Sequence, residues 1–186
     1  MIKVLLLGDS GVGKSCLLRK FTERKFVAST QPTVGVEFAS RVVRLGSQKL
    51  RLHIWDAPGL TLFRPILRSY YRGTSVVVLV FDVTNRSTFQ DLSRWIQDCR
   101  DCCEPATLLV LVGNKCDQVR RRVSRTEALL LVNEHSLEGY YETSAQNSDS
   151  VDHLFTEGVA RPVLLRPVPF LLEEHSPPPR GCCCYR

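Results

Sequence analysis

The stretch that decides the fold is Gly8-Asp9-Ser10-Gly11-Val12-Gly13-Lys14-Ser15, which fits the pattern GxxxxGK[ST]. It follows the apolar run Ile2 to Leu7 and leads into a segment of helical periodicity, Lys14 to Thr22. Glycines in such a loop let backbone N–H groups turn toward a phosphate, and Lys14 supplies a cation for the β and γ phosphates. The Ser15 hydroxyl can ligate Mg²⁺. This strand, loop and helix therefore predict a nucleotide-phosphate site.

The same arrangement of short apolar runs and helical segments continues along the chain of 186 residues. Runs rich in Val, Leu and Ile fit strands that are buried on both faces, as in a parallel sheet. The expected further strands are Leu50 to Trp55, Val76 to Phe81 and Leu108 to Val112; the expected further helices are Ser87 to Cys99 and Arg125 to Glu134. We therefore predict an α/β fold with a mostly parallel central sheet and helices on both faces.

Two local features refine this organisation. The segments Arg41 to Leu45 and Leu50 to Ile54 read as a hairpin that turns at Gly46 and Ser47. A last helix could start within residues 151–160, where Gly158 and Pro162 should shorten it. We therefore expect one domain over residues 1–161 and a proline-rich flexible tail over residues 162–186.

The choice of base rests on Asn114-Lys115-Cys116-Asp117, which directly follows an expected strand. A carboxylate such as Asp117 can accept hydrogen bonds from N1–H and the exocyclic amine of guanine, a pair of donors that adenine lacks. The later tripeptide Thr143-Ser144-Ala145 supports this interpretation only in combination with the earlier motifs. The sequence thus predicts guanine as the bound base.

Taken together, residues 1–160 resemble a Ras-like GTPase, a P-loop NTPase of the Ras-like G-domain type. Three stretches are similar to the Rab branch: Thr33-Val34-Gly35-Val36-Glu37-Phe38, Tyr70-Tyr71-Arg72-Gly73 and Phe81-Asp82-Val83-Thr84-Asn85. The resemblance implies GTP or GDP as ligand, together with Mg²⁺. It also implies that Phe38, Trp55 and Tyr70 form an aromatic surface for effectors, although ordinary burial in the core is an equal alternative.

The resemblance further assigns the site residues. Phe26 is expected against the guanine ring, and Thr33 is expected to sense the γ-phosphate. The residues implied for the nucleotide are Ser10, Gly11, Val12, Gly13, Lys14, Ser15, Cys16, Phe26, Thr33, Gly59, Asn114, Lys115, Asp117, Ser144, Ala145 and Gln146. Those implied for Mg²⁺ are Ser15, Thr33 and Asp56.

One departure from the family pattern concerns catalysis. The chain reads Trp55-Asp56-Ala57-Pro58-Gly59-Leu60-Thr61 where the family has WDTAGQE, so Leu60 replaces the glutamine that orients the attacking water. Leucine has neither donor nor acceptor. Of the two catalytic positions, Lys14 is retained and Leu60 is impaired, so we expect hydrolysis to be weak or to depend on an activating protein.

The chain ends Gly181-Cys182-Cys183-Cys184-Tyr185-Arg186, similar to the endings on which Rab proteins carry two lipids. Attachment at Cys183 and Cys184 would anchor the protein stably, since two lipid chains are needed for this. The expected location is the cytoplasmic face of an intracellular or plasma membrane, with a cytosolic pool.

Three functions are compatible with these features. The first is a membrane-anchored Rab-like switch in vesicle trafficking, with an exchange factor, an activating protein, prenylation machinery and effectors as partners. A pseudo-GTPase scaffold is the second, favoured by Leu60. A P-loop kinase or ATPase is disfavoured by Asp117 and its motif.

Nucleic acid is not an expected partner despite the net charge of +6, because the Lys and Arg residues are scattered. Cys99 and Cys102 lack the second pair that a zinc site needs.

Overall fold

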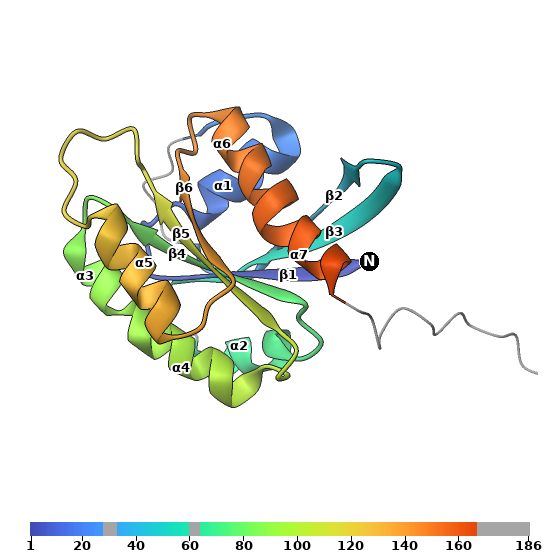
Figure 1. Ribbon diagram of the computed structural model, residues 1–186, viewed down its shortest axis with the longest axis horizontal. Helices are drawn as coiled ribbons and strands as arrows, with labels where there is room; N and C mark the ends of the chain where they lie inside the picture. Colours follow the sequence, from blue (N-terminus) through green and yellow to red (C-terminus); the bar gives the residue numbers. More distant parts are fainter. Residues whose placement is uncertain (28–32, 60–63, 167–186) are drawn as a thin grey trace, which may run out of the picture.

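A single six-stranded sheet organises the molecule, with the strands in the order β2-β3-β1-β4-β5-β6 (Figure 1). This computed structural model describes residues 1–27, 33–59 and 64–166. The strands are β1 (Ile2–Leu7), β2 (Glu37–Leu45), β3 (Gln48–Asp56), β4 (Val76–Asp82), β5 (Leu108–Asn114) and β6 (Gly139–Thr143). Only β2 and β3 pair in antiparallel fashion, and all other neighbours are parallel. The predicted mostly parallel α/β fold is confirmed.

Helices cover both faces of this sheet (Figure 1). On one face lie α1 (Lys14–Glu23), α6 (Ser148–His153), the π-helical segment Leu154–Ala160 and α7 (Arg161–Leu165). On the other lie α2 (Arg64–Tyr71), α3 (Arg86–Gln90), α4 (Leu92–Cys102) and α5 (Arg125–Glu134). The alternation of side chains along β1 supplies both layers: Val4 and Leu6 join the first core, and Leu5 and Leu7 join the second.

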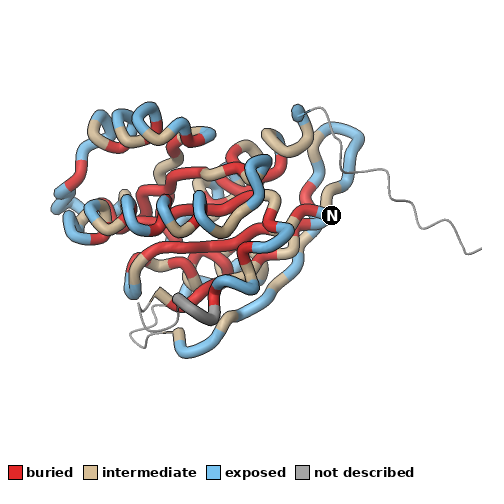
Figure 2. Tube along the Cα trace, turned by 90° about the horizontal axis from the view of Figure 1, so that it is seen from below, coloured by how far each residue is buried: buried red, intermediate tan, exposed pale blue. Residues whose placement is uncertain are grey.

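The central strands β1, β4 and β5 are almost entirely buried, and Figure 2 shows them as the red trace through the middle of the molecule. Every residue of β4 is buried, which explains why this strand reads as a continuous apolar run rather than an alternating one. A parallel sheet brings the carboxyl ends of its strands to one edge, where the loop Gly8 to Gly13 follows β1 and Asn114 closes β5.

The expected hairpin is confirmed and is longer than predicted, with a turn at Gly46, whose φ is 60°. The helix expected over Ser87 to Cys99 is instead two helices that meet at Asp91, where ψ is −10°. Asn85 caps the first of them by accepting a hydrogen bond from the Ser87 backbone N–H at 3.2 Å. Strand β6 was not predicted, because five residues of mixed polarity carry little periodic signal.

The expectation that Gly158 and Pro162 shorten the last helix is wrong. Helical structure runs from α6 through the π-helical segment to Leu165. The division of the chain at residue 161 stays a prediction. Pro162 lies in α7 directly after the π-helical segment, so the helix continues through this proline. Gly158 lets the helix approach Tyr141 of β6, since a Cβ there would lie 2.9 Å from Tyr141 Cε2. Across the described ranges, no helix is long and apolar enough to cross a membrane.

This close approach predicts that Gly158→Val destabilises the protein. Helix propensity alone would slightly favour the substitution, so a loss of stability reports the clash with the ring. We expect a loss of about 1–3 kcal/mol, which corresponds to a fall in Tm of about 2–4 °C per kcal/mol, measured by thermal unfolding. In a Tyr141→Ala background the substitution should cost less. An equal cost in both backgrounds would show that the ring is not the obstacle.

Candidate functional site

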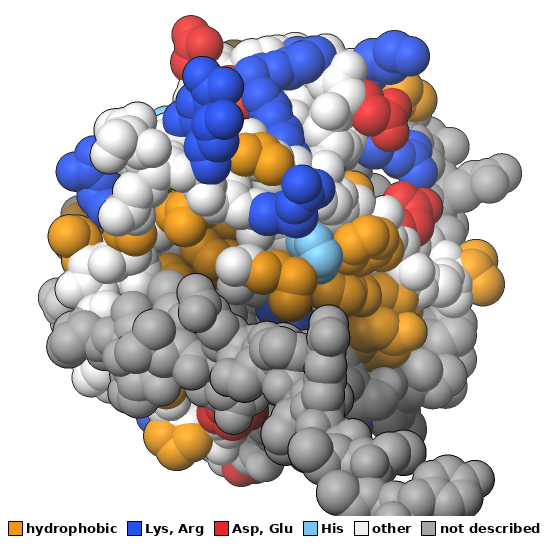
Figure 3. Space-filling view, turned by 90° about the vertical axis from the view of Figure 1, so that its right-hand side faces the viewer, with side chains coloured by type: hydrophobic (Ala, Val, Ile, Leu, Met, Phe, Trp, Pro, Cys, Tyr) orange, Lys and Arg blue, Asp and Glu red, His pale blue; other side chains and the backbone are white. Residues whose placement is uncertain are grey.

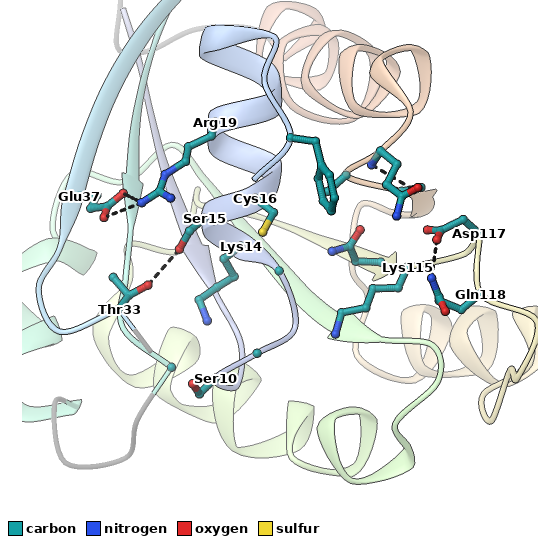
Figure 4. A pocket seen from close by; sticks show the side chains of 18 of the residues that line it. Ser10, Lys14, Ser15, Cys16, Arg19, Thr33, Glu37, Lys115, Asp117 and Gln118 are labelled. Carbon is teal, nitrogen blue, oxygen red and sulfur yellow. Dashed lines mark hydrogen bonds and ion pairs between the residues drawn. The ribbon is translucent and has the colours of Figure 1, made fainter. Parts of the chain in front are cut away.

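A cavity of about 470 Å³ opens at the carboxyl edge of the sheet (Figure 4). Its volume lies within the usual range for a small-molecule site. Of the residues predicted for the nucleotide, all but Val12 line it: Ser10, Gly11, Gly13, Lys14, Ser15, Cys16, Phe26, Thr33, Gly59, Asn114, Lys115, Asp117, Ser144, Ala145 and Gln146. Val12 is fully buried in the core and contributes its backbone carbonyl instead, as described below.

The phosphate loop, Gly8 to Gly13, is shaped by its glycines and by Lys14, which directly follows it. Gly11 and Gly13 have φ values of 80° and 97°, which favour glycine. Gly13 precedes α1 without any side-chain cap, so the first N–H groups of a ten-residue helix remain available to an anion. Lys14 Nζ donates to the carbonyls of Gly8 at 2.6 Å and Asp9 at 2.8 Å. This places a cation at the helix N-terminus.

Burial of Lys14 has an electrostatic cost. Desolvation lowers the pKa of the ammonium group to about 8, and the nearby carboxylates of Asp56 and Asp9 offset only part of that effect. A phosphate anion in the cavity would favour the charged form and restore its pKa. The lysine is therefore poised for an anionic ligand.

Oxygen atoms suited to Mg²⁺ converge beside the lysine. Ser15 Oγ lies 3.0 Å from Thr33 Oγ1 and donates to Asp56 Oδ2. Asp56 is fully buried, and its Oδ1 has no hydrogen-bond partner within the described part of the chain. Burial raises the pKa of Asp56 to about 6, although the Ser15 hydroxyl lowers it. An unsatisfied buried carboxylate oxygen next to two hydroxyls fits a hard divalent cation.

At the other end of the cavity, Asn114 joins the parts of the site. Its Nδ2 donates to the Val12 carbonyl at 2.8 Å, and its Oδ1 accepts from Thr143 Oγ1 at 3.1 Å. Both ends of the amide are thus engaged within the protein. Asn114 lines the cavity as predicted, and its hydrogen bonds hold the phosphate loop against the end of β6.

Asp117 presents an exposed carboxylate to the same cavity. The Ser144 hydroxyl lowers its pKa, helped by Gln118, whose Nε2 donates to Asp117 Oδ2 at 2.7 Å. The group therefore stays ionised and can accept from two donors on a base, as guanine offers. Phe26 also lines the cavity with 42% of its surface exposed, which leaves an apolar ring available to a base.

Lys115 lies between these groups and the sheet. Its φ of 63° is unusual for a residue other than glycine. The ammonium group forms an ion pair with Asp82 Oδ2 at 2.6 Å, which anchors the side chain to the end of β4. The buried carboxylate of Asp82, on the neighbouring strand β4, therefore fixes the path of the loop that carries Asp117.

Several cavity residues were not predicted from the sequence: Arg19, Val34, Glu37 and Gln118. Arg19 of α1 pairs with Glu37 of β2 at 3.2 Å, as the dashed lines in Figure 4 show. Neither residue belongs to a phosphate or base motif, and an ion pair across 18 positions leaves no signal in one sequence. The pair connects the helix that carries Ser15 to the strand that follows Thr33.

Gly59 is the last described residue before residue 60, and it touches the phosphate loop. A Cβ at this position would lie 2.3 Å from Ser10 N and from Asp9 C, so only glycine fits. Leu60, Cys183 and Cys184 lie outside the described residues. Their predicted roles remain predictions.

The raised pKa of Asp56 predicts competition between protons and Mg²⁺. The carboxyl group binds metal only when ionised, so the Mg²⁺ concentration needed for half-maximal nucleotide retention should rise about tenfold for each pH unit below the pKa of about 6. Asp56→Asn should bind Mg²⁺ more weakly and show a smaller pH dependence. The nucleotide phosphates titrate equally in both proteins, so the difference isolates Asp56. Equal slopes would contradict the assignment.

The comparison with known proteins agrees with this geometry. A family model described as the Ras family matches residues 3–163. The match covers all six strands apart from Ile2, both ends of the cavity and the residues arranged for Mg²⁺. Proteins of this family are small GTPases that bind GTP or GDP, generally with Mg²⁺, and that act through regulators and effectors. A phosphate loop, an oxygen cluster and an exposed carboxylate for guanine, in one cavity of a matching fold, lead to one conclusion: the chain belongs to the Ras family of small GTPases.

Proposed function

We propose that this protein is a Rab-type switch in vesicle trafficking, held on a membrane by lipids and slow to hydrolyse GTP by itself. The observation that carries the switch is the convergence of Ser15, Thr33 and Gly59 on the phosphate end of one cavity. Thr33 precedes β2, and Gly59 precedes the segment before α2. A γ-phosphate at this point would bind both segments at once, and its loss would release them.

Support for the Rab type comes from the sequence stretches and from an aromatic surface on the β2–β3 hairpin. Phe38 has 55% of its surface exposed, and its ring lies 4.8 Å from Trp55 and 5.4 Å from His53 between centroids. Tyr70 and Trp55 are half-buried and pack against the core, which is compatible with either interpretation of these aromatics. Figure 3 shows apolar side chains gathered around a histidine, with Lys and Arg beside them. Such a surface suits recognition by an effector protein.

The hydrolysis step is where this chain departs from its relatives. In a Ras-like enzyme a glutamine amide orients the attacking water, and Leu60 cannot. Pro58 lies two residues earlier and fixes a backbone dihedral beside the contact between Gly59 and the phosphate loop. The second candidate, a pseudo-GTPase scaffold that binds nucleotide without cycling by its own hydrolysis, is favoured by the same leucine.

We expect Leu60→Gln to raise single-turnover phosphate release from bound GTP. A gain of about tenfold corresponds to roughly 1.4 kcal/mol of transition-state stabilisation, which one water-positioning hydrogen bond can supply. The wild-type protein, Leu60→Gln, and Pro58→Ala combined with Leu60→Gln form the comparison. Adding Pro58→Ala tests whether a stiff backbone limits the rescue. Wild-type release as fast as the double variant would contradict both impaired hydrolysis and the scaffold.

Anchoring is tested separately, because it rests on Cys183 and Cys184 alone. Replacing both by Ser should shift the protein from the membrane fraction to the cytosol, since no helix of the described part can span a membrane. Cys182→Ser is the matched control and should leave the distribution unchanged. Membrane-bound protein with an unmodified C-terminus, shown by mass spectrometry, would refute lipid attachment and leave the nucleotide assignments intact.

A further inference from the structure

The phosphate loop contains an acidic residue, Asp9, although the loop is suited to binding an anion. A carboxylate that faced the phosphates would repel them and weaken nucleotide binding. Among the described residues that line the nucleotide cavity, Ser10 is present and Asp9 is not. The acidic side chain is therefore directed to a contact outside the cavity.

That contact is with the indole of Trp95 on α4. Trp95 Nε1 donates a hydrogen bond to Asp9 Oδ1 at 2.9 Å, across 86 positions of the chain. The indole is 2% exposed and packs in the apolar core between α4 and the sheet, together with Leu92 and Ile96. A buried indole N–H needs an acceptor, and Asp9 supplies one. Helix α4 thus holds the phosphate loop from outside the cavity.

The backbone of Asp9 meets two further parts of the nucleotide site. Its carbonyl oxygen accepts a hydrogen bond from Lys14 Nζ at 2.8 Å. A Cβ on Gly59 would lie 2.3 Å from the Asp9 carbonyl carbon, so the segment before residue 60 lies directly against this peptide. A shift of Asp9 would therefore move an acceptor of the phosphate-binding lysine and the surface that Gly59 contacts.

The charge of Asp9 adds to the effect of its position. Burial raises the pKa of Asp9, the hydrogen bond from Trp95 lowers it, and the nearby Asp91 raises it. An ionised Asp9 in turn favours the charged form of Lys14, whose pKa burial lowers to about 8. The indole thus helps to keep a carboxylate ionised near the lysine, which offsets part of the lysine's desolvation.

We propose that Trp95 is a positioning residue for the nucleotide phosphates and that it acts through Asp9. Its hydrogen bond fixes the Asp9 peptide, and that peptide fixes one acceptor of Lys14 and the contact with Gly59. Without the bond, the loop would hold Lys14 less well against the phosphates, and nucleotide would leave faster. The inference rests on nucleotide binding by the family and not on the Rab type, on Leu60 or on lipid attachment.

Nucleotide dissociation from the full-length protein tests this role. Trp95→Phe keeps an aromatic ring in the core and removes the N–H, so a fluorescent GDP analogue should leave about tenfold faster than from the wild type in the presence of Mg²⁺. Ile96→Val is the matched control, because Ile96 is the next residue of the same helix and lies in the same core. It should lower the Tm and leave the dissociation rate unchanged. Dissociation from Trp95→Phe at the wild-type rate would overturn the proposal.

A double-mutant cycle separates positioning from packing. Asp9→Ala removes the acceptor, so Trp95→Phe should still lower the Tm in this background but should no longer accelerate dissociation. Equal acceleration with and without Asp9 would show that Trp95 acts by packing alone and would overturn the proposal.

A comparison at Asp9 itself tests the same bond if Trp95→Phe does not fold. Asp9→Asn and Asp9→Ala both remove the charge, and only Asp9→Ala removes the acceptor. Nucleotide should therefore leave Asp9→Ala about threefold to tenfold faster than Asp9→Asn. Equal rates in the two variants would contradict a role for the hydrogen bond.

The indole emission gives a readout that a merely structural tryptophan would not give. Trp55 and Trp95 are the two tryptophans of the chain, so Trp55→Phe leaves the Trp95 signal alone. Removing the nucleotide with EDTA should shift this emission, because the loop that carries Asp9 loses its ligand. The shift should be absent when Asp9→Ala is added. An emission that ignores the nucleotide, or a shift that persists without Asp9, would overturn the coupling. None of these results bears on hydrolysis or on membrane anchoring.

Discussion

The side-chain amide of Asn114 holds the nucleotide site together. One hydrogen bond reaches back 102 positions to the Val12 carbonyl in the phosphate loop, and the other reaches forward to Thr143 at the end of β6. Because all these groups are buried, a lost partner would leave an unsatisfied polar atom in a dry environment. The amide also explains Gly13, where a Cβ would lie 2.4 Å from Asn114 Nδ2. One side chain at the end of β5 therefore holds together the phosphate loop and the end of β6.

The site also holds charges that the apoprotein stabilises poorly. Lys14 and Asp56 are both buried, and desolvation moves each pKa toward neutrality, to about 8 and about 6. Their mutual attraction offsets part of this cost. Phosphates and Mg²⁺ supply the missing opposite charges, since a bound anion favours the ammonium and a metal favours the carboxylate. The burial that makes these charges costly would also strengthen their attraction to a charge-dense ligand.

Contacts at the phosphate end also join the cavity to more distant surfaces. Thr33 and Gly59 reach the cavity from segments that continue into β2 and α2. Gly59 lies against the Asp9–Ser10 peptide so closely that no side chain fits. The ion pair of Arg19 with Glu37 adds a second link from α1 to β2. Direct contacts thus connect the phosphate end of the cavity to the hairpin that bears Phe38 and Trp55.

The sequence by itself determined the fold class, the phosphate loop and most of the residues that line the cavity, because glycine spacing and buried apolar runs are local signals. It did not reveal the break at Asp91, strand β6 or the passage of the last helix through Pro162, since tertiary packing decides each of these. Gly158 shows why: a glycine that weakens an isolated helix is required where Tyr141 approaches it. Likewise, the pairing of Arg19 with Glu37 depends on which elements meet in space, and one sequence carries no record of such a contact.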